Sequence, residues 1–499
     1  MDNKFDVVII GAGVIGNAVA DLLSNYNLSI AVLDKEADTA FGISGRNSGV
    51  LHSGFNNPPG SLKARLCVQG CKGFQDVAAG LGIEFVKTGK LIVANSDEEK
   101  LELLKLKNQG DMNSTEGLSI IGQEEIQAIN GKIHGISGLL SENSGIFNPF
   151  EYTIALANRA RRKGVKYYFN NEVVKIETIL SSSKKRESDE QTNFGIKGEE
   201  RFHITTKVGK EGSKEFYSEW LIDSAGLQSD KICRMLGIED YEIVPKRGEY
   251  HVLDKRFLPD LKMPVYPVPK KESGVLGIHL TNTLSGNIMI GPSGENIEGK
   301  EDYQTTKIIM DRLLEEGSMF HEDIRKSFVI RSFSGVRPKL KQKVAGVDED
   351  FVIEESKDVK GFVILAGIES PGMTSAIPIA NMVLEIMRES PNSGIYEIPN
   401  NGKQVIFEDK DEYGYSNIIC RCEGISEGKI LKAFDSILYI SGIPTLRGIK
   451  NRTRAGMGRC QGGFCTNRIL KLLERERKID LVDLVLFNED SPIIYGRLR

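Results

Sequence analysis

The chain has 499 residues, which is too long for one ordinary hydrophobic core and predicts two or three domains. Its 40% hydrophobic and 27% charged residues are typical of a water-soluble globular protein, and a net charge of −4 gives no reason to expect a nucleic-acid partner. The acidic start does not match a secretory signal, and the apolar stretch 361–387 is interrupted by polar residues, proline and glycine, which disfavours a membrane span.

Three cysteines, Cys67, Cys71 and Cys233, are scattered and do not resemble a secreted disulfide framework. We therefore expect a reducing cytoplasm, with contact to the inner face of a membrane only through a partner subunit.

The first elements predict a dinucleotide site. A strand over 5–10 is followed by Gly11, Gly13 and Gly16, a helix over 14–24 and a second strand over 29–33. In such a turn the first glycine makes the bend, the second admits a pyrophosphate, and the third allows close helix–strand packing. Asp34, 23 positions after Gly11, stands where an acid accepts hydrogen bonds from ribose. The alternative is a structural glycine turn, and the motif alone does not decide between FAD and a nicotinamide.

The middle of the chain mixes helix and strand patterns. We expect a helix over 151–163 after Pro149, strands over 165–169 and 172–176, and a hairpin tip or mobile loop in the polar stretch 181–201. A buried strand over 362–366 and an apolar helix over 374–387 follow. The Pro-, Asn- and Gly-rich stretch 391–403 is the best linker candidate.

Four cysteines near the C-terminus predict a metal centre. Cys420 and Cys422 form one arm, and Cys460 and Cys465 form another after 37 residues. Four thiolates suit an iron–sulfur cluster or zinc, and this spacing favours [2Fe–2S] over the Cys-x2-Cys knuckles of zinc sites. Unligated thiols are the third possibility.

Helices are expected to follow both arms, capped by Ser426 and Thr466, because a helix N-terminus stabilises an anionic cluster. Arg452, Arg454 and Arg459 precede the second arm and are expected to act in the same direction.

The segment Gly45–Gly54 resembles the flavin-side loop of FAD-dependent oxidoreductases related to D-amino acid oxidase, and Pro59–Cys67 resembles the group with L-2-hydroxyglutarate and glycerol-3-phosphate dehydrogenases. Five later stretches are similar to the same proteins, so the resemblance covers about residues 5–390. They are Asp223–Gly226, Arg247–Tyr250, Gly277–Thr281, Ser334–Pro338 and Glu369–Ala376.

This resemblance implies FAD as the cofactor, held by residues from several distant parts of the chain. The implied contacts are Gly11, Gly13, Gly16, Asp34, Ser44, Arg46, Asn47, Ser48, Gly49, Leu51, Val173, Ala225, Gly226, Gly367, Gly372, Met373 and Thr374. The last three are expected to place a helix N-terminus beside the flavin, where it stabilises the negative charge of the reduced ring.

The segment Arg452–Cys465 closely resembles the bacterioferritin-associated ferredoxin-like domain that ends the large subunit of anaerobic glycerol-3-phosphate dehydrogenase. The implied ligands of its [2Fe–2S] cluster are Cys420, Cys422, Cys460 and Cys465. The two resemblances together imply an α/β plus α+β protein: a Rossmann-like FAD-binding domain, an interleaved antiparallel-sheet substrate domain and a small helical iron–sulfur domain.

We expect the oxidoreductase unit to occupy residues 1–395. Its FAD-binding segments are about 1–80, 145–240 and 335–395, and its substrate segments about 81–144 and 241–334. A linker over 396–412, the cluster domain over 413–485 and a tail over 486–499 complete the chain.

Three residues are candidates for catalysis. His52 is the first choice for a base, because the resemblance places it along the flavin and imidazole titrates near neutral pH; the alternative is a backbone or flavin contact without proton transfer. His279 is second, with a packing role as its alternative. Arg337 is the best anion anchor, because a guanidinium grips carboxylate or phosphate at two points; its alternative is an internal salt bridge.

These features predict a dehydrogenase that oxidises the CH–OH group of a small anionic substrate and passes electrons to a protein or quinone-linked subunit, in a hetero- or homo-oligomer. The lead substrate is sn-glycerol 3-phosphate, ahead of L-2-hydroxyglutarate and of amines or imino acids. Phe55, Asn56 and Asn57 replace the Arg-Tyr pair that usually follows the histidine in glycerol-3-phosphate enzymes, which puts phosphate recognition in doubt. A hypothesis of another class is a non-catalytic electron-transfer or redox-sensing protein.

Overall fold

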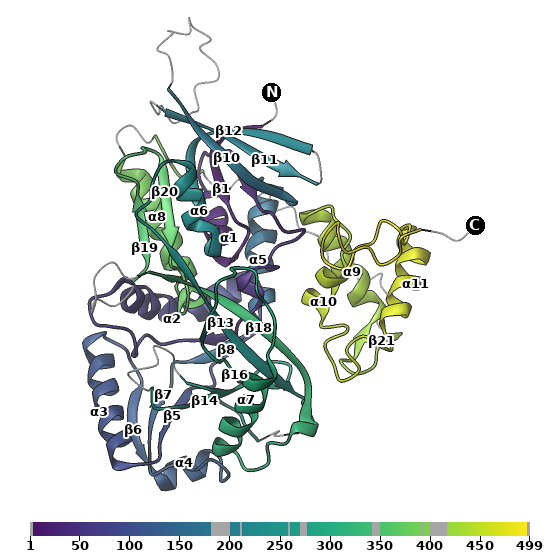
Figure 1. Cartoon of the computed structure of the whole chain (residues 1–499). Coiled ribbons are helices and arrows are strands. Elements are labelled where there is room, and N and C mark those ends of the chain that lie inside the picture. Colours follow the sequence, from purple (N-terminus) through teal and green to yellow (C-terminus); the bar gives the residue numbers. More distant parts are fainter. Residues whose placement is uncertain are drawn as a thin grey trace, which may run out of the picture.

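The computed structural model describes residues 3–180, 200–209, 212–257, 260–269, 277–341, 350–390, 394–398 and 417–496. It shows a body built on two sheets and a smaller C-terminal module beside it (Figure 1). Most of the stretch predicted as a polar loop, and most of the predicted linker, lie outside these residues. The part of the linker that is described contacts the body: the backbone N–H of Ile398 donates to the carbonyl of Asn25 at 2.9 Å.

The first sheet carries the N-terminal strand at its centre, flanked by parallel neighbours. Its order is β10-β11-β12-β1-β2-β9, with β20 paired to β12 and β19 to β20. The strands are β1 (Lys4–Ile10), β2 (Ile30–Leu33), β9 (Lys166–Tyr168), β10 (Asn171–Leu180), β11 (Glu200–Val208), β12 (Gly212–Asp223), β19 (Val352–Glu355) and β20 (Phe362–Ala366).

Helices cover both faces of this sheet because side chains of a strand alternate between faces. Val7 and Ile9 of β1 belong to one buried cluster, while Val8 and Ile10 belong to the other. The first cluster packs against α1 (Val14–Leu23), α2 (Leu62–Leu81), α5 (Pro149–Arg162) and α8 (Gly372–Glu389); the second packs against α6 (Ser229–Met235).

The second sheet is largely antiparallel. Its order is β17-β13-β16-β15-β14-β5-β7-β6, with β18 paired to β13 and one parallel pair between β14 and β5. The strands are β5 (Lys90–Ala94), β6 (Leu118–Gly122), β7 (Ser137–Ser141), β13 (Ile243–Leu253), β14 (Val265–Pro267), β15 (His279–Asn282), β16 (Ile288–Gly291), β17 (Glu295–Asn296) and β18 (Val329–Leu340). Its helices are α3 (Asp97–Met112), α4 (Gln123–Ile129) and α7 (Lys307–Phe320).

The chain crosses between the two sheets several times, which brings distant segments to one boundary. A small sheet of β3 (Val50–Leu51), β8 (Gly145–Phe147) and β4 (Phe85–Val86) lies near that boundary. The predicted combination of a Rossmann-like unit with an interleaved, mainly antiparallel sheet is confirmed.

Two predicted helices begin earlier than expected. The helix predicted over 151–163 starts at Pro149, because the side chain of Asn148 accepts from the backbone N–H of Phe150 at 3.1 Å. The helix predicted over 374–387 starts at Gly372, so Gly372 and Met373 lie in its first turn.

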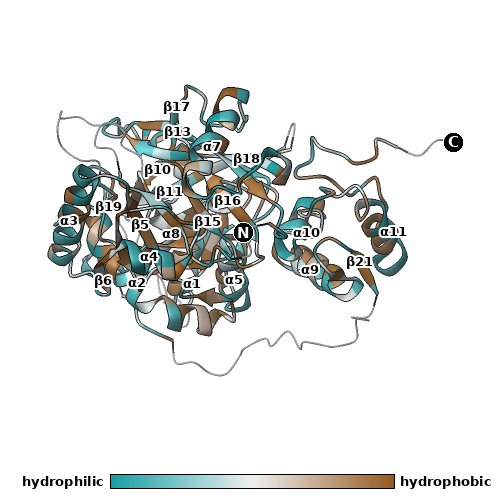
Figure 2. Ribbon diagram, turned by 90° about the horizontal axis from the view of Figure 1, so that it is seen from below, coloured by the Kyte–Doolittle hydropathy of each residue, from teal (hydrophilic) through white to brown (hydrophobic). Residues whose placement is uncertain are grey.

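The C-terminal module has its own core around Phe434, Ile437 and Leu473. It consists of β21 (Ile418–Cys420), β22 (Ile425–Ser426), α9 (Glu427–Ile440), α10 (Leu446–Thr453) and α11 (Thr466–Arg477). In the views of Figures 1 and 2, α10 faces the body and α11 lies on the far side, and the inward faces of these helices are the more hydrophobic. None of the described helices has the length and apolar composition that a bilayer span requires.

Candidate active site and cysteine module

The glycine turn after β1 is packed tightly against a second segment of the chain. Gly11 has φ +104°, and a Cβ there would lie 2.5 Å from the carbonyl oxygen of Ser224. A Cβ at Gly16 would lie 2.0 Å from the carbonyl oxygen of Gly11. Only glycine fits at either position, and Gly11, Gly13 and Ser224 all line the cavity beside this turn.

Asp34 follows directly after the last residue of β2. Its carboxylate accepts hydrogen bonds from the backbone N–H groups of Ala12, at 2.6 Å, and of Glu36, at 2.8 Å. Burial, together with the charge of Glu36, raises the pKa of Asp34 to about 6. The carboxylate is thereby held at the mouth of the glycine turn with lone pairs left for a hydroxyl-bearing ligand.

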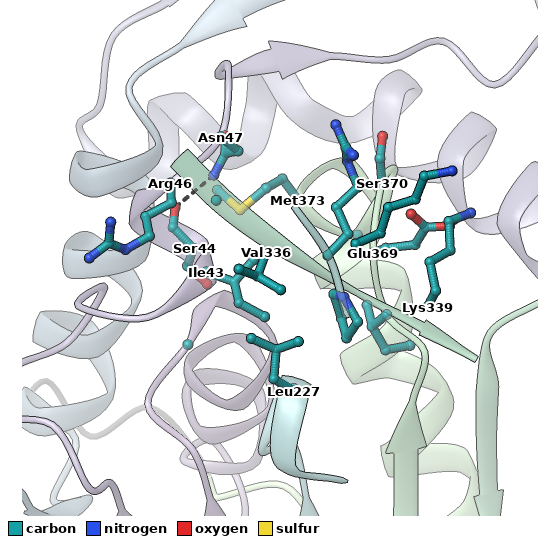
Figure 3. A pocket seen from close by; sticks show the side chains of 18 of the residues that line it. Ile43, Ser44, Arg46, Asn47, Leu227, Val336, Lys339, Glu369, Ser370 and Met373 are labelled. Carbon is teal, nitrogen blue, oxygen red and sulfur yellow. Dashed lines mark hydrogen bonds and ion pairs between the residues drawn. The ribbon is translucent and has the colours of Figure 1, made fainter. Parts of the chain in front are cut away.

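A cavity of about 1370 Å³ runs from this turn to the boundary between the sheets. It exceeds the roughly 300–1,000 Å³ of pockets for drug-sized ligands and has room for a dinucleotide and a small substrate. Figure 3 shows Arg46 and Asn47 on one side of it, with Lys339 and Glu369 on the other.

Most of the residues proposed from the sequence line this one cavity. They are Gly11, Gly13, Asp34, Ser44, Arg46, Asn47, Ser48, His52, Val173, Ala225, Gly226, His279, Arg337, Gly372, Met373 and Thr374. Gly16, Gly49, Leu51 and Gly367 do not line its wall.

His52 is held between two elements that the sequence separates by more than 300 residues. Its backbone N–H donates to Oγ1 of Thr374 at 3.1 Å, and its Nε2 lies 3.4 Å from Oγ of Ser370. Burial, followed by the positive charge of Lys90 and the proximity of His279, lowers the pKa of His52 well below its usual value. The ring is therefore neutral at pH 7 and can accept a proton.

His279 stacks on Tyr266 with ring centroids 3.7 Å apart. Its Nδ1 lies 3.0 Å from the carbonyl oxygen of Gly277, so Nδ1 carries the hydrogen and Nε2 keeps its lone pair. Nε2 has no hydrogen-bond partner among the described residues. Burial is the main cause that lowers the pKa of His279 to about 3. The hydrogen bond to Gly277 opposes this shift, and the positive charges of Lys90 and Arg337 add to it.

Arg337 presents one unpaired nitrogen. Its Nη2 donates to the carbonyl oxygen of Ser293 at 3.1 Å, whereas Nη1 is buried with no hydrogen-bond partner in the described part of the chain. Gly248 makes room for the guanidinium, because a Cβ there would lie 2.7 Å from Nη2. The guanidinium is half-buried and its charge is partly balanced by Glu369, and Nη1 remains as a hydrogen-bond donor that an anionic ligand can meet.

Sequence reasoning gave no role to a charged group beside these residues. The side chain of Glu369 is 6% exposed and pairs with Lys63 at 3.1 Å and with Lys339 at 2.5 Å. Burial opposes its ionisation, but the two ammonium charges outweigh that effect and hold the pKa of Glu369 below its usual value. Lys63 and Glu369 both fall in stretches singled out by resemblance, which was the available signal.

Lys90 is a second charged residue to which the sequence patterns assigned no role. Its side chain is 1% exposed, and its Nζ lies 4.5 Å from the ring centre of Phe55 and 4.9 Å from that of Tyr266. Burial lowers the pKa of Lys90 to about 8. A single lysine in an otherwise apolar strand gave no signal of this aromatic cage.

In the C-terminal module the four predicted ligand cysteines come together as two pairs. Cys422 and Cys460 have their sulfurs 3.6 Å apart, and Cys465 forms its side-chain hydrogen bond with Cys420. Each pair thus takes one cysteine from each arm. Within the described residues, no three His, Cys, Asp or Glu side chains are grouped for a single metal ion. The two thiol pairs supply the four thiolates that a [2Fe–2S] cluster requires.

Of the two predicted helix caps in the module, one is confirmed and the other is wrong. Ser426 caps α9 as expected, accepting from the backbone N–H of Lys429 at 3.3 Å, but the N-cap of α11 is Cys465. Thr466 is the first helical residue, and its hydroxyl donates to the carbonyl oxygen of Gly462 at 2.8 Å.

The three arginines before the second arm are engaged by carboxylates and do not stand free beside the cysteines. Arg452 pairs with Asp38, Arg454 with Glu423, and Arg459 with Asp254. The first pair is the most buried, with side chains 5% and 0% exposed. Asp38 and Asp254 belong to the body, so Arg452 and Arg459 attach the module to it.

Comparison with known proteins agrees with this geometry. The model of the FAD dependent oxidoreductases matches residues 6–386, and that of the BFD-like [2Fe-2S] binding domain matches 418–475. The chain belongs to the FAD dependent oxidoreductase family. It is therefore an enzyme that uses FAD and carries a [2Fe–2S]-binding domain, and both cofactor predictions are confirmed.

Among relatives of this oxidoreductase, the glycerol 3-phosphate dehydrogenase of Caloramator mitchellensis is 34% identical over 510 residues, covering 99% of this chain and 98% of that protein. The mitochondrial L-2-hydroxyglutarate dehydrogenase of Bos taurus is 31% identical over 427 residues, covering 78% of this chain and 89% of that one. Among solved structures, L-alpha-glycerophosphate oxidase from Mycoplasma pneumoniae with FAD bound matches with a TM-score of 0.69 and 27% identity, covering 79% of this chain and 99% of that chain.

The cavity of this oxidoreductase fits FAD. The glycine turn gives backbone access for a pyrophosphate, Asp34 stands at the place for a ribose, and the first turn of α8 lies at the cavity wall beside His52.

Proposed function

We propose that this oxidoreductase is a dehydrogenase that converts the CH–OH group of a small anionic substrate to a carbonyl, with sn-glycerol 3-phosphate as the lead substrate and dihydroxyacetone phosphate as its product. The observation that carries the proposal is the unpaired, buried Nη1 of Arg337 in the same cavity as two neutral histidines. The similarity over nearly the whole length of the glycerol 3-phosphate dehydrogenase of Caloramator mitchellensis supports the choice of substrate.

The chain's own residues divide the work. Arg337 grips the anionic group of the substrate and fixes the distance of the carbinol carbon from the two imidazoles. His52, kept neutral by burial and by Lys90, accepts the hydroxyl proton. His279 offers an unprotonated Nε2 that orients the same hydroxyl. Bound FAD supplies the hydride acceptor, and the cluster supplies one-electron transfer to a protein or quinone acceptor.

A second substrate has specific support. Asn56 and Asn57 line the cavity directly after the His52 segment, where glycerol-3-phosphate enzymes usually have an Arg-Tyr pair. Amide side chains are suited to a carboxylate as well as to a phosphate, and the relatives include L-2-hydroxyglutarate dehydrogenases. L-2-Hydroxyglutarate is therefore the alternative substrate.

The deciding experiment is anaerobic bleaching of the flavin absorption band of the purified holoenzyme. The panel contains sn-glycerol 3-phosphate, L-2-hydroxyglutarate, their enantiomers, and glycine and proline as amine controls. We expect fast bleaching by sn-glycerol 3-phosphate alone. Bleaching only by L-2-hydroxyglutarate selects the alternative, and bleaching only by an amino acid overturns both. In a His52→Gln variant the bleaching rate should fall about 100-fold or more, with substrate affinity unchanged.

A further inference from the structure

The four cysteines differ sharply in their exposure to solvent. Cys420 and Cys465 are each 1% exposed, whereas Cys460 lies at the surface. One pair therefore faces inward, and the pair of Cys422 and Cys460 faces outward. Any partner that takes electrons from this module reaches it most closely at Cys460.

An exposed aromatic side chain flanked by two arginines follows closely on Cys460 in the second cysteine arm. Phe464, four positions after Cys460, is 38% exposed, although large aromatic side chains are normally buried. The guanidinium carbons of Arg421 and Arg468 lie 4.7 Å and 4.8 Å from the centre of its ring. The three residues come from the first cysteine arm, the second arm and α11, and we call them the cation–aromatic patch.

The two arginines of this patch have no acidic partner among the described residues. Neither Arg421 nor Arg468 forms an ion pair with a carboxylate of the described residues, whereas Arg452, Arg454 and Arg459 all do. Figures 1 and 2 show α10 on the side of the module that faces the body, with α11 on the far side. The arginines before the second cysteine arm are thus matched by carboxylates, whereas the two guanidiniums of the patch are not matched within the described residues.

We propose that the cation–aromatic patch is the docking surface for an acidic one-electron carrier protein. This rests on the proposed function, because it assumes that electrons leave the enzyme through the cysteine module. Oxidation of one CH–OH group to a carbonyl releases two electrons and two protons, so two copies of a one-electron carrier are reduced for each substrate.

The chemistry of the patch favours a protein over a membrane surface. Arginine and exposed aromatic side chains are the residues enriched at the centres of protein interfaces. Segments that bind anionic lipid headgroups carry about four to eight lysines or arginines, twice or more the number in the patch. A carrier with a carboxylate-rich surface satisfies both guanidiniums and steers its redox group towards Cys460.

Binding and electron transfer can be measured without any substrate. The probe is an acidic plant-type [2Fe–2S] ferredoxin, titrated into holoenzyme at low salt by calorimetry and, separately, mixed in oxidised form with dithionite-reduced holoenzyme. In the double variant Arg421→Glu/Arg468→Glu we expect the Kd to rise at least tenfold. The difference from wild type should shrink at roughly 0.5 M salt, because salt screens exposed charges. Phe464→Ala should weaken binding by a smaller factor, with little salt dependence.

The matched control is Lys429→Glu/Lys432→Glu, which makes the same charge change at exposed positions of α9. It should alter the Kd less than twofold, and visible circular dichroism should show an intact cluster in every variant. No saturable binding by the wild type, an unchanged Kd in the patch variant, or an equal loss in the control would each overturn the proposal. The wild type could instead fail to bind ferredoxin but float with anionic phosphatidylserine vesicles, while the patch variant does not float. That result would show that the patch binds a membrane surface and not a carrier protein.

This test is separate from the test of the proposed function. Substrate bleaching of the flavin should be the same in wild type and in Arg421→Glu/Arg468→Glu, because the patch lies outside the cavity. If no substrate bleaches the flavin but the patch variant still loses ferredoxin binding, the proposed function fails and the docking surface stands.

Discussion

The cavity and the cysteine module differ in whether key polar side chains have hydrogen-bond or ion-pair partners within the described chain. In the cavity, Nη1 of Arg337 and Nε2 of His279 are buried without hydrogen-bond partners in the described chain, so they await a ligand. In the module, the inner arginines are matched with carboxylates, and Arg452 and Asp38 form a nearly dry pair. The unpartnered atoms of the cavity can form hydrogen bonds with a ligand, whereas the ion pairs of the module stabilise its contact with the body.

The regions also differ in how local they are. The cavity gathers residues from position 10 to position 374, whereas the cysteines lie on two arms within the last 80 residues. Changes in the module should therefore have confined effects, and changes in the cavity should act through several segments. Four substitutions, taken from the largest expected effect to the smallest, test this contrast.

Cys465→Ser should abolish cluster binding while flavin content stays normal. Cys465 is buried and paired with Cys420, so its loss removes one ligand from the inner pair. Iron analysis should fall from about two atoms per chain to near zero, with loss of the cluster absorption. Cys233→Ser, a buried cysteine of α6, should keep its iron. Zinc in the wild-type protein, or normal iron in Cys465→Ser, would contradict the assignment.

Asp38→Asn should loosen the module from the body. Breaking one partner of a buried pair costs about 3–5 kcal/mol, because Arg452 is left charged and dry. Urea unfolding followed by cluster absorbance should show the loss. The control is Glu489→Gln, which alters an exposed contact with Asn170 between the same two units and should cost under about 1 kcal/mol. Equal effects of the two would show that burial of the pair is unimportant.

Arg337→Met should lower kcat/KM for the anionic substrate about 100-fold, or roughly 3 kcal/mol, because a charged hydrogen-bond partner of the substrate is removed. Arg337→Lys should recover part of the loss. Arg331→Met, an exposed arginine of the same strand β18 outside the cavity wall, is the control. Unchanged kinetics in Arg337→Met would assign the arginine to internal structure.

Lys90→Met should shift the acidic limb of the pH profile of kcat/KM to higher pH. The positive charge of Lys90 lowers the pKa of His52 and of His279, so its removal lets both rings protonate more easily as pH falls. The activity at pH 7 should change by less than about tenfold, because both rings remain buried. Lys87→Met, an exposed neighbour, should leave the limb in place. A shift towards lower pH would show that the lysine does not act through its charge.

Much of this protein could be predicted from short stretches of sequence. Two sites are indicated by patterns that each span few residues. The strand–glycine–helix pattern around Gly11, with Asp34, indicates dinucleotide binding, and the two cysteine arms indicate a metal centre. Backbone conformation and ligand chemistry are local properties, so spacing indicated a dinucleotide site and a thiolate metal site, while the choice of FAD came from the family resemblance. Family resemblance then indicated His52, His279 and Arg337, and the structure brings all three to one cavity.

Only the tertiary structure decided which charged side chains form ion pairs or aromatic contacts and which have none within the described chain. Nothing near Glu369 in the sequence indicates that Lys63 and Lys339 neutralise it, and nothing near Lys90 indicates an aromatic cage formed by Phe55 and Tyr266. The same holds for the cysteines, whose pairs join one arm to the other, and for Arg452, whose partner lies 414 positions away. Electrostatic pairing depends on distance in space and on exclusion of water, and both are set only when separate segments pack together.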